Sequence, residues 1–496
     1  MRHFLGWVCA VLSGANAGWA NDNSLRVNVP GGVIEGVADP SGQAALFRGI
    51  PFAAPPLDDL RWRAPREVIA WKGVRAAQAR APGCPQNDFG WNRADYLTAR
   101  EDCLTLDIRT PGRIGKRPVM VWIHGGSNRA GSAGDTVLSR LSDHGVVLVA
   151  IQYRLGVLGF LAPRGAAEEA GGHAGNYGLM DQIAALRWIR DNIAKFGGDP
   201  ANVTIFGESA GSQDVSLLLA APSARGLFHK AVMESGTPGF GMPPRNLADG
   251  FAVADSLSAL VDASGDMTKL RSRSVAALLE ADRKVVDPAI PNPNDFLWLR
   301  TTVDGAVITE MPRALLAKAP PVPVIIGSNK VEFGPSAGSI DMDAYLAAWF
   351  GPASAAAISW YRDPSRKRDP RAGHLELEMA TDVVFECPAA HLAELLSDRG
   401  WPVWRYEFDV TNSAALTAHA GEIPWVLGEK TFRSGNSLVS LGRYWTNFAK
   451  SGDPNGGLPL WPRHQSAEAI YAAFDNAGVH QRRATRSPPC TLTENL

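Results

Sequence analysis

The chain has 496 residues, of which 45% are hydrophobic and 20% are charged, as is ordinary for a globular protein with a large core. Its formal net charge is −1, and no long run of one charge sign occurs. These features argue against a nucleic-acid-binding protein and against a basic or acidic tail. Average domain size would divide such a chain into two or three domains, but α/β folds of this length often form one unit.

The first twenty residues have the pattern of a secretory signal peptide. Arg2 precedes the apolar run Phe4–Leu12, and small residues follow up to Ala20. This run is too short to span a bilayer, and no later stretch reaches the necessary ~18–20 apolar residues. We therefore expect residues 1–20 to be removed on export and residues 21–496 to form a single domain, periplasmic or extracellular. A frayed N-terminal helix is the alternative interpretation.

The chain contains five cysteines. Removal of Cys9 with the signal peptide leaves Cys84, Cys103, Cys387 and Cys490. An even number in an exported chain permits disulfides, and four cysteines allow three connectivities.

Several apolar runs lack the alternation of a half-exposed strand, which is typical of strands buried on both faces of a sheet. Gly178–Ile193 has apolar residues at helical spacing, and Ser212–Leu219 predicts a second helix. Strand, crossover helix and strand in succession predict a mostly parallel central sheet with helices on both faces. The segment Arg245–Leu315 is rich in helix formers and is expected to pack beside the sheet as a helical insertion. The predicted strands are Val119–Ile123, Val146–Ile151, Val203–Phe206, Val322–Ile326 and Val403–Phe408.

The segment Gly207–Gly211 reads Gly-Glu-Ser-Ala-Gly and fits the nucleophile elbow G-x-S-x-G. This elbow is a sharp strand-to-helix turn that lifts the serine hydroxyl above the sheet edge, and its two glycines prevent clashes in the turn. The N-terminus of the following helix supplies a backbone N–H and a favourable dipole for developing negative charge. The pattern therefore predicts Ser209 as a nucleophile.

The same five-residue pattern occurs a second time, at Gly334–Gly338. Short glycine motifs arise by chance in a chain with 50 glycines. Ser209 follows the strand-like segment Asn202–Phe206 and precedes a helical run, whereas Ser336 follows a polar turn and Pro335. The context thus favours Ser209 over Ser336.

A glycine-rich turn, His124–Ser127, directly follows the predicted strand Val119–Ile123. In esterases a turn at this place supplies backbone N–H groups to the oxyanion, and small residues let the backbone approach the substrate carbonyl. An ordinary Gly-Gly strand end is the alternative interpretation.

The general base of such a fold is a histidine on a later loop, because the chain order is serine, acid, histidine. Spacing alone does not choose among the histidines that follow Ser209. These are His229, His374, His391, His419, His464 and His480.

The chain resembles the type-B carboxylesterase family, which includes the cholinesterases and bacterial para-nitrobenzyl esterases. The resemblance covers nearly everything after the predicted signal peptide and implies an α/β-hydrolase fold. Two segments carry it most clearly: Glu101–Ile108 resembles one family signature, and the elbow around Ser209 lies in the other. The further matching segments are Phe47–Pro56, Gln152–Gly156, Gly175–Leu179, Phe196–Pro200, Tyr444–Ala449 and Gly452–Asn455.

The resemblance selects the acid and the base. The family acid stands in a G-x-N-x-x-E context, which Gly327–Glu332 matches, so Glu332 is implied as the acid. Phe333 departs from the glycine usual after that acid. The family histidine lies three residues before a Glu-Ile pair, which implies His419 as the base.

Two other carboxylates compete with Glu332 for the role of the acid. Glu208 lies in the elbow, where its side chain is expected to point away from that of Ser209 and to serve as a buried charge. Glu422 is close to His419 in sequence, but this fold delivers its acid from a loop after an earlier strand.

The family's oxyanion donors map to the backbone N–H groups of Gly126, Ser127 and Ala210. Ser127 departs from the glycine or alanine frequent at its place. The resemblance also implies the disulfides Cys84–Cys103 and Cys387–Cys490. Trp91 lies near the place of a cation-binding tryptophan in cholinesterases, but the shorter loop here favours a packing role.

The resemblance implies a serine hydrolase that cleaves small-molecule carboxylic esters through an acyl-enzyme. No cofactor is implied, and no metal motif such as H-E-x-x-H occurs. Carbamates, amides or a polyester are alternative substrates, because pocket shape decides the substrate. A catalytically inactive binding protein is disfavoured, because all three triad positions are occupied. The sequence leaves the physiological ester and the oligomeric state open.

Overall fold

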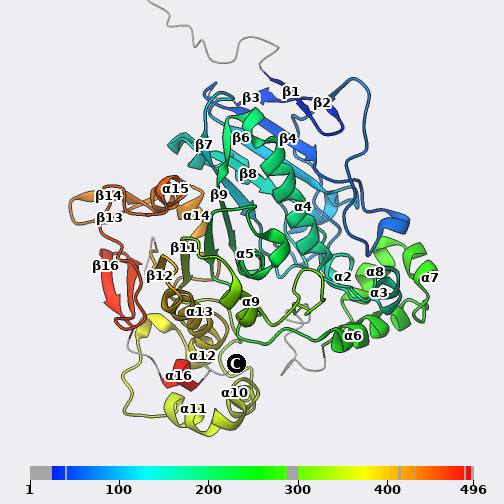
Figure 1. Ribbon diagram of the computed structural model, residues 1–496. Helices are drawn as coiled ribbons and strands as arrows, with labels where there is room; N and C mark the ends of the chain where they lie inside the picture. Colours follow the sequence, from blue (N-terminus) through cyan, green and yellow to red (C-terminus); the bar gives the residue numbers. More distant parts are fainter. Residues whose placement is uncertain are drawn as a thin grey trace, which may run out of the picture.

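The computed structural model describes residues 25–39, 42–287, 300–411, 415–428, 430–484 and 488–492. The predicted signal peptide lies outside these residues. Within the described chain, an 11-stranded sheet has the order β16-β15-β12-β11-β10-β9-β7-β8-β6-β4-β3 (Figure 1). Its strands are β3 Val37–Ala38, β4 Ala45–Pro51, β6 Thr105–Thr110, β7 Arg117–Ile123, β8 Val147–Ile151, β9 Gly198–Glu208, β10 Lys230–Glu234, β11 Val324–Asn329, β12 Val403–Asp409, β15 Ile470–Asp475 and β16 Gly478–Arg483.

The middle of this sheet is parallel and its edges are antiparallel. Strands β8, β7, β9, β10, β11, β12 and β15 pair in parallel along the sheet. Strands β3, β4 and β6 at one edge and β16 at the other pair antiparallel. Two small sheets lie outside it, namely β1 Arg26–Val29 with β2 Gly32–Glu35 and β5 Val74–Ala76, and the hairpin β13 Thr431–Ser434 with β14 Ser437–Ser440. The prediction of a mostly parallel sheet is thus correct.

Each central strand contributes to two hydrophobic cores, one on each face of the sheet. In β7, Val121 and Ile123 point to the core that contains Leu186 of helix α4. Met120 and Trp122 point to the core on the other face. Burial on both faces explains why this strand reads as a continuous apolar run.

Helices cover both faces of the sheet (Figure 1). Helices α4 Tyr177–Asn192 and α5 Ala210–Ala220 lie on one face, and α15 Leu441–Ser451 packs on the other. The predicted helical segment after Arg245 forms α6 Leu247–Leu260, α7 Met267–Ser272, α8 Val275–Asp282 and α9 Pro312–Lys318. The remaining helices are α1 Arg93–Thr98, α2 Gly156–Phe160, α3 Arg164–Glu169, α10 Met342–Phe350, α11 Ser354–Tyr361, α12 Leu375–Thr381, α13 Cys387–Asp398, α14 Ile423–Val426 and α16 Pro488–Leu492.

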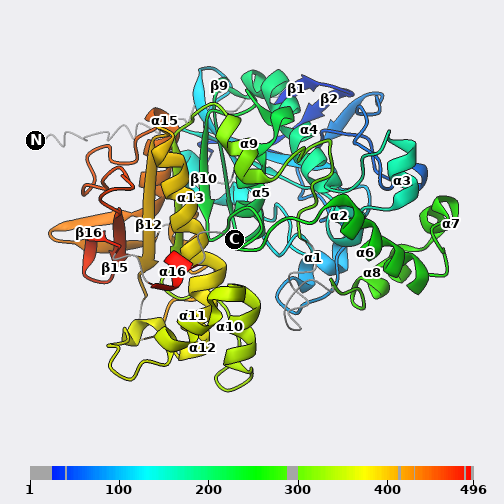
Figure 2. The same ribbon diagram turned by 60° about the horizontal axis from the view of Figure 1, so that its bottom comes forward.

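Two helical groups project from the sheet at different places. Helices α10, α11, α12 and α16 form one group, and α3, α6, α7 and α8 form the other (Figures 1 and 2). The first group encloses a separate apolar cluster around Trp349 and Phe385. Among the described residues, no helix combines the length and the apolar composition that a membrane crossing requires.

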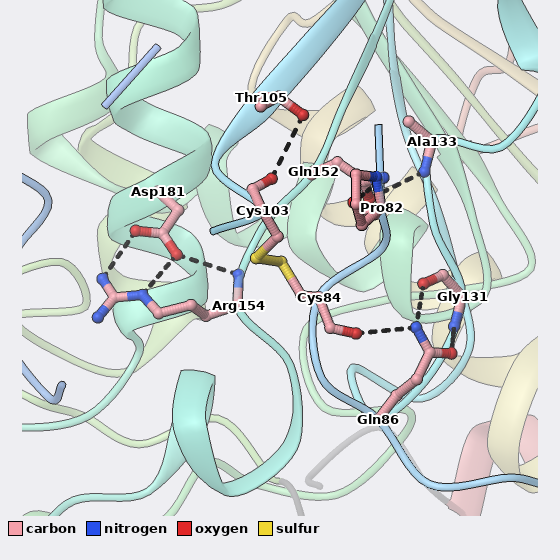
Figure 3. Close-up of a disulfide and its surroundings, with 10 residues drawn as sticks. All are labelled: Pro82, Cys84, Gln86, Cys103, Thr105, Gly131, Ala133, Gln152, Arg154 and Asp181. Atoms are coloured by element: carbon pink, nitrogen blue, oxygen red, sulfur yellow. Dashed lines mark hydrogen bonds and ion pairs between the residues drawn. A yellow bond between two sulfur atoms is a disulfide. The ribbon is translucent and has the colours of Figure 1, made fainter. Parts of the chain in front are cut away.

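The structure forms both disulfides that the resemblance implies. Cys84 bonds to Cys103 across 19 residues of sequence, and Cys387 bonds to Cys490 across 103 residues. The first bond closes the loop that carries α1, and the second ties α16 to the start of α13. Gln86, inside the first loop, donates to the carbonyl of Gly131 (2.9 Å) and accepts from its N–H (2.9 Å), as Figure 3 shows. The disulfide loop is therefore fixed to the chain that follows β7.

Candidate functional site

Ser209 stands at the turn between the end of β9 and the start of α5. Its backbone has φ 58° and ψ −125°, a strained conformation for a residue with a side chain. A Cβ atom on Gly211 would lie 2.1 Å from the carbonyl oxygen of Ile123, so the helix packs against β7 only because this residue is glycine. The local geometry is that of the predicted elbow, and Ser209 lines a cavity.

The glycine-rich turn after β7 lies beside this serine. A Cβ atom on Gly125 would lie 3.1 Å from the Cβ atom of Ser209. Gly126 and Ser127 both have positive φ, 104° and 60°. Within the described chain, the N–H groups of Gly126, Ser127 and Ala210 form no hydrogen bonds. These three donors are therefore free to bind an oxygen atom of a ligand.

His419 and Glu332 form a hydrogen-bonded pair near the carboxyl ends of the parallel strands, where Ser209 also lies. His419 Nδ1 lies 2.6 Å from Glu332 Oε2. The other carboxylate oxygen, Oε1, accepts from the Asn329 N–H (2.7 Å) and the Ser235 hydroxyl (2.7 Å). Glu332 follows β11, and His419 lies on a loop after β12. These bonds fix the carboxylate, which in turn orients the imidazole ring.

Glu208 approaches the other ring nitrogen of the same histidine. Its Oε1 lies 3.1 Å from His419 Nε2. Burial raises the pKa of Glu208 to about 8, against the opposing charge of His419 and together with the negative charges of Glu422 and Glu332. Burial alone would lower the pKa of His419, but the Glu208 and Glu332 carboxylates outweigh it and raise this pKa to about 9. The ring is thus held between two acidic side chains that stabilise its protonated form.

Glu422 is buried nearby but does not contact His419. Its Oε2 accepts from Asn329 Nδ2 at 2.6 Å, and its Oε1 lies 3.3 Å from Ser235 Oγ. Burial and the Glu332 charge raise the pKa of Glu422 to about 7. Of the three candidate carboxylates, Glu332 alone contacts Nδ1 of His419.

The rival serine and the other histidines lie away from this arrangement. Ser336 is exposed in a turn. Among the six histidines after Ser209, all of them in the described chain, His419 lines the cavity that contains Ser209. His464, for example, is buried and bonds instead to the carbonyl of Ile470 (2.8 Å).

The cavity has a volume of about 1030 Å³ and mostly apolar walls. Phe333 faces the His419 ring edge-on, with ring centroids 4.6 Å apart and planes at 89°. Phe385 lies 5.1 Å from the same ring. The departure from glycine at Phe333 therefore places an aromatic wall beside the histidine. The cavity's apolar lining includes Phe89, Trp91, Trp122, Phe333, Ile423 and Leu427.

Trp91 lies at the cavity and does not pack in the interior. It is 66% exposed, and a Cβ atom on Gly126 would lie 3.0 Å from the end of its ring. The preference for a packing role is thus wrong. The ring borders the glycine-rich turn.

Two features of the site were not predicted from the sequence. Glu208 is buried, as expected, but its contact with His419 was not foreseen. Ser235, which bonds Glu332 from the end of β10, was given no role. The one signal in the sequence for the Glu208–His419 contact was the position of Glu208 next to Ser209. No motif indicated the bond between Ser235 and Glu332.

Comparison with known proteins identifies the family of this chain. A model of the carboxylesterase family matches residues 23–492. Carboxylesterase 1E of Rattus norvegicus is 35% identical over 497 residues, covering 88% of this chain and 86% of the relative. Liver carboxylesterase 1 of Oryctolagus cuniculus is 34% identical over 536 residues, covering 93% and 92%.

A solved structure, a PNB esterase, is also similar. Its TM-score is 0.80 at 29% identity, and the match covers 95% of this chain and 100% of that chain. The likeness confirms the predicted α/β-hydrolase fold. The chain therefore belongs to the carboxylesterase family and is a carboxylic-ester hydrolase.

Proposed function

We propose that this protein hydrolyses carboxylic esters through an acyl-enzyme, with Ser209 as nucleophile, His419 as general base and Glu332 as the supporting acid. The 2.6 Å contact between His419 Nδ1 and Glu332 Oε2 carries this proposal. It leaves Nε2 as the nitrogen that can take the serine proton, and His419 and Ser209 line the same cavity. The fixed carboxylate holds the ring in the tautomer that can accept a proton at Nε2.

The reaction has two halves. Nε2 of His419 takes the proton of Ser209 as Oγ bonds to the ester carbonyl carbon, and the carbonyl oxygen becomes an oxyanion. Collapse of this intermediate breaks the bond to the alcohol oxygen, which receives the proton from His419. Water, deprotonated by His419, then attacks the acyl-enzyme and releases the acid and Ser209.

The oxyanion is proposed to bind the N–H groups of Gly126, Ser127 and Ala210. These donors have no hydrogen bonds within the described chain, and Ala210 is the first residue of α5. Donors fixed in place before the reaction stabilise the transition state without reorganisation. The imidazolium that accompanies the oxyanion lies between Glu332 and Glu208.

The cavity favours esters with apolar groups. Its aromatic and aliphatic walls give apolar contact to both parts of an ester. A volume of about 1030 Å³ accommodates groups larger than acetyl. Carbamates and amides present the same carbonyl to the same donors, so a direct comparison must decide among them.

The test is a hydrolysis screen with one chromophoric leaving group. We expect para-nitrophenyl esters from acetyl to octanoyl to be cleaved, with a higher kcat/KM for the longer chains. The matched anilide and carbamate should react at least about 10²-fold more slowly. Faster cleavage of the anilide or carbamate would assign another substrate class. No hydrolysis of any ester by folded protein would refute the proposed function.

Ser127 is expected to act through its backbone N–H. Its hydroxyl has no hydrogen-bond partner among the described residues, and its φ of 60° suits glycine better than any other residue. Ser127→Gly and Ser127→Ala should therefore keep kcat within about threefold, as measured with a para-nitrophenyl ester. Loss of an oxyanion donor costs about 10²–10³ in kcat, so a loss of that size in both variants would show that the hydroxyl is a donor.

We also propose that residues 1–20 direct export and that residues 21–496 form one domain. The two disulfides support an oxidising compartment, periplasmic or extracellular. N-terminal sequencing of the exported protein tests this proposal, and a chain that retains its first twenty residues contradicts it.

A further inference from the structure

The two halves of the proposed oxyanion hole lie on separate elements, and one side-chain pair joins them. Gly126 and Ser127 lie on the turn after β7, whereas Ala210 begins α5. Asn128, the next residue of the turn, donates from Nδ2 to Asp214 Oδ1 at 3.0 Å. Asp214 is four residues after Ala210, one turn along the same helix.

Both partners are fixed at their outer sides as well. Asp214 Oδ2 accepts from Gln182 Nε2 of α4 at 2.5 Å. The backbone carbonyl of Asn128 accepts from the Gly156 N–H at 2.6 Å. The Tyr153 hydroxyl donates to the His124 carbonyl (2.6 Å) and lies 3.1 Å from Asn128 Oδ1. The turn is thus held at His124, before the glycines, and at Asn128, after Ser127.

This network is buried away from the substrate. Asn128 is 3% exposed, and Asp214 is fully buried. Neither residue lines the cavity that contains Ser209. Burial raises the pKa of Asp214 to about 7, against the opposing effect of its two amide donors. Within the described chain Asp214 forms no ion pair. No cation therefore offsets the loss of hydration of this buried carboxyl.

We propose that Asn128 and Asp214 form a positioning pair that sets the distance between the two halves of the oxyanion hole. This inference rests on the proposed function, because it presumes that the N–H groups of Gly126, Ser127 and Ala210 bind the oxyanion. The bond from turn to helix keeps these donors converging on one point. Neither side chain touches the reacting atoms.

Such a role has a kinetic signature. The donors act on the charge that develops in the transition state, whereas the cavity walls bind the ester groups in the ground state. A small displacement of the turn should therefore lower kcat and leave KM nearly unchanged. The affinity for a trifluoromethyl ketone, which forms an oxyanion on reaction with the serine, should fall in parallel with kcat.

The experiment exchanges the two polar groups. Asn128→Asp places two carboxyl groups against each other, and we expect kcat to fall at least about tenfold with KM within about threefold. Asp214→Asn is nearly isosteric and should show a smaller loss of the same kind. The double variant carries both substitutions and restores the contact. The amide nitrogen at position 214 can donate to the carboxylate at position 128, and the amide oxygen at position 214 can accept from Gln182. We expect the double variant to recover most of the lost kcat and ketone affinity.

Asp304→Asn is the matched control. Asp304 is a fully buried carboxyl that accepts from the N–H groups of Ala306, Val307 and Ile308, and it does not line the cavity. It should lower the melting temperature without changing kcat per folded molecule. If Asn128→Asp does not fold, Asp214→Asn and the double variant give the same comparison.

Two outcomes would overturn the inference. Folded single variants with wild-type kcat and ketone affinity would reduce the pair to a structural contact. Folded single variants with low kcat that the double variant does not rescue would show that the contact itself is not responsible. Phosphonate labelling of Ser209 in the wild-type protein separates these results from failure of the proposed function, since a protein that is not labelled there would refute that function first.

Discussion

Ser209→Ala is expected to abolish ester hydrolysis while the fold is retained. Removal of the nucleophile lowers kcat about 10⁶-fold in a well-studied serine protease, and we expect a loss of that order here. Alanine removes only Oγ, and the φ of 58° at this position is already strained by the serine Cβ. Activity should be measured with a para-nitrophenyl ester. An organophosphonate probe with peptide mapping reports the labelled residue directly.

Ser336→Ala is the matched control for this variant. Ser336 stands in the same five-residue pattern, but in an exposed turn away from His419. We expect wild-type activity and labelling in Ser336→Ala. Labelling that persists in Ser209→Ala, or disappears in Ser336→Ala, would move the nucleophile to another residue.

The central strands and the elbow were predictable because they depend on local patterns. The five predicted strands correspond to β7, β8, β9, β11 and β12, with ends shifted by a few residues. Each is buried on both faces, so its apolar run is continuous. The edge strands were not predicted. The central strand β10 was also not predicted, because its apolar run of three residues lies between Lys230 and Glu234. β16 has a mostly exposed pattern, and β4 has a register irregularity between Phe47 and Ile50, so neither shows a simple period.

The site was predictable only in part, because its contacts join distant segments of the chain. Ser209 follows from its motif, but Glu332 and His419 are 87 residues apart and were selected through the family resemblance. The approach of Glu208 to His419 depends on a side-chain direction that the elbow motif does not specify. The Asn128–Asp214 contact spans 86 residues and has no sequence pattern of its own. Contacts between residues so far apart in the sequence form only in the folded sheet, which brings the strand ends together, so no local pattern predicts them.

Glu332→Gln is expected to cause the second large loss. The analogous acid-to-amide change in a Ser–His–Asp protease lowers kcat about 10⁴-fold, and we expect a similar loss here. The bonds of Glu332 explain the size of this effect. Its Oε1 accepts from the Asn329 N–H and the Ser235 hydroxyl, so the amide oxygen of glutamine will occupy that position. The NH₂ group then faces His419 Nδ1 and forces the ring proton onto Nε2, which can no longer accept the serine proton.

The pH dependence gives a second measurement of the same change. His419 must be neutral to act as a base, and the Glu208 and Glu332 carboxylates outweigh burial to raise its pKa to about 9. The wild-type kcat/KM should therefore increase with pH up to about 9. Loss of the Glu332 charge removes one of the two main raising effects, so the rising limb in Glu332→Gln should move to lower pH. A structural role for Glu332 would leave this limb in place.

Glu208→Gln and Glu422→Gln distinguish Glu332 from its two rivals. Glu208 contacts Nε2 and not Nδ1, so its neutral variant keeps the tautomer and loses only part of the stabilisation of the imidazolium. Its pKa of about 8 means that this carboxyl is ionised at pH 9 and mostly neutral at pH 7. We therefore expect a loss of about 10- to 10²-fold in kcat at pH 9 and a smaller loss at pH 7. Glu422 contacts Asn329 and Ser235 and not His419, and its pKa of about 7 means that it is already partly neutral at pH 7. Glu422→Gln should therefore keep kcat within about tenfold of wild type. If folded Glu332→Gln stays within about threefold of wild type while either rival variant is inactive, the acid is that rival and the proposed triad is wrong.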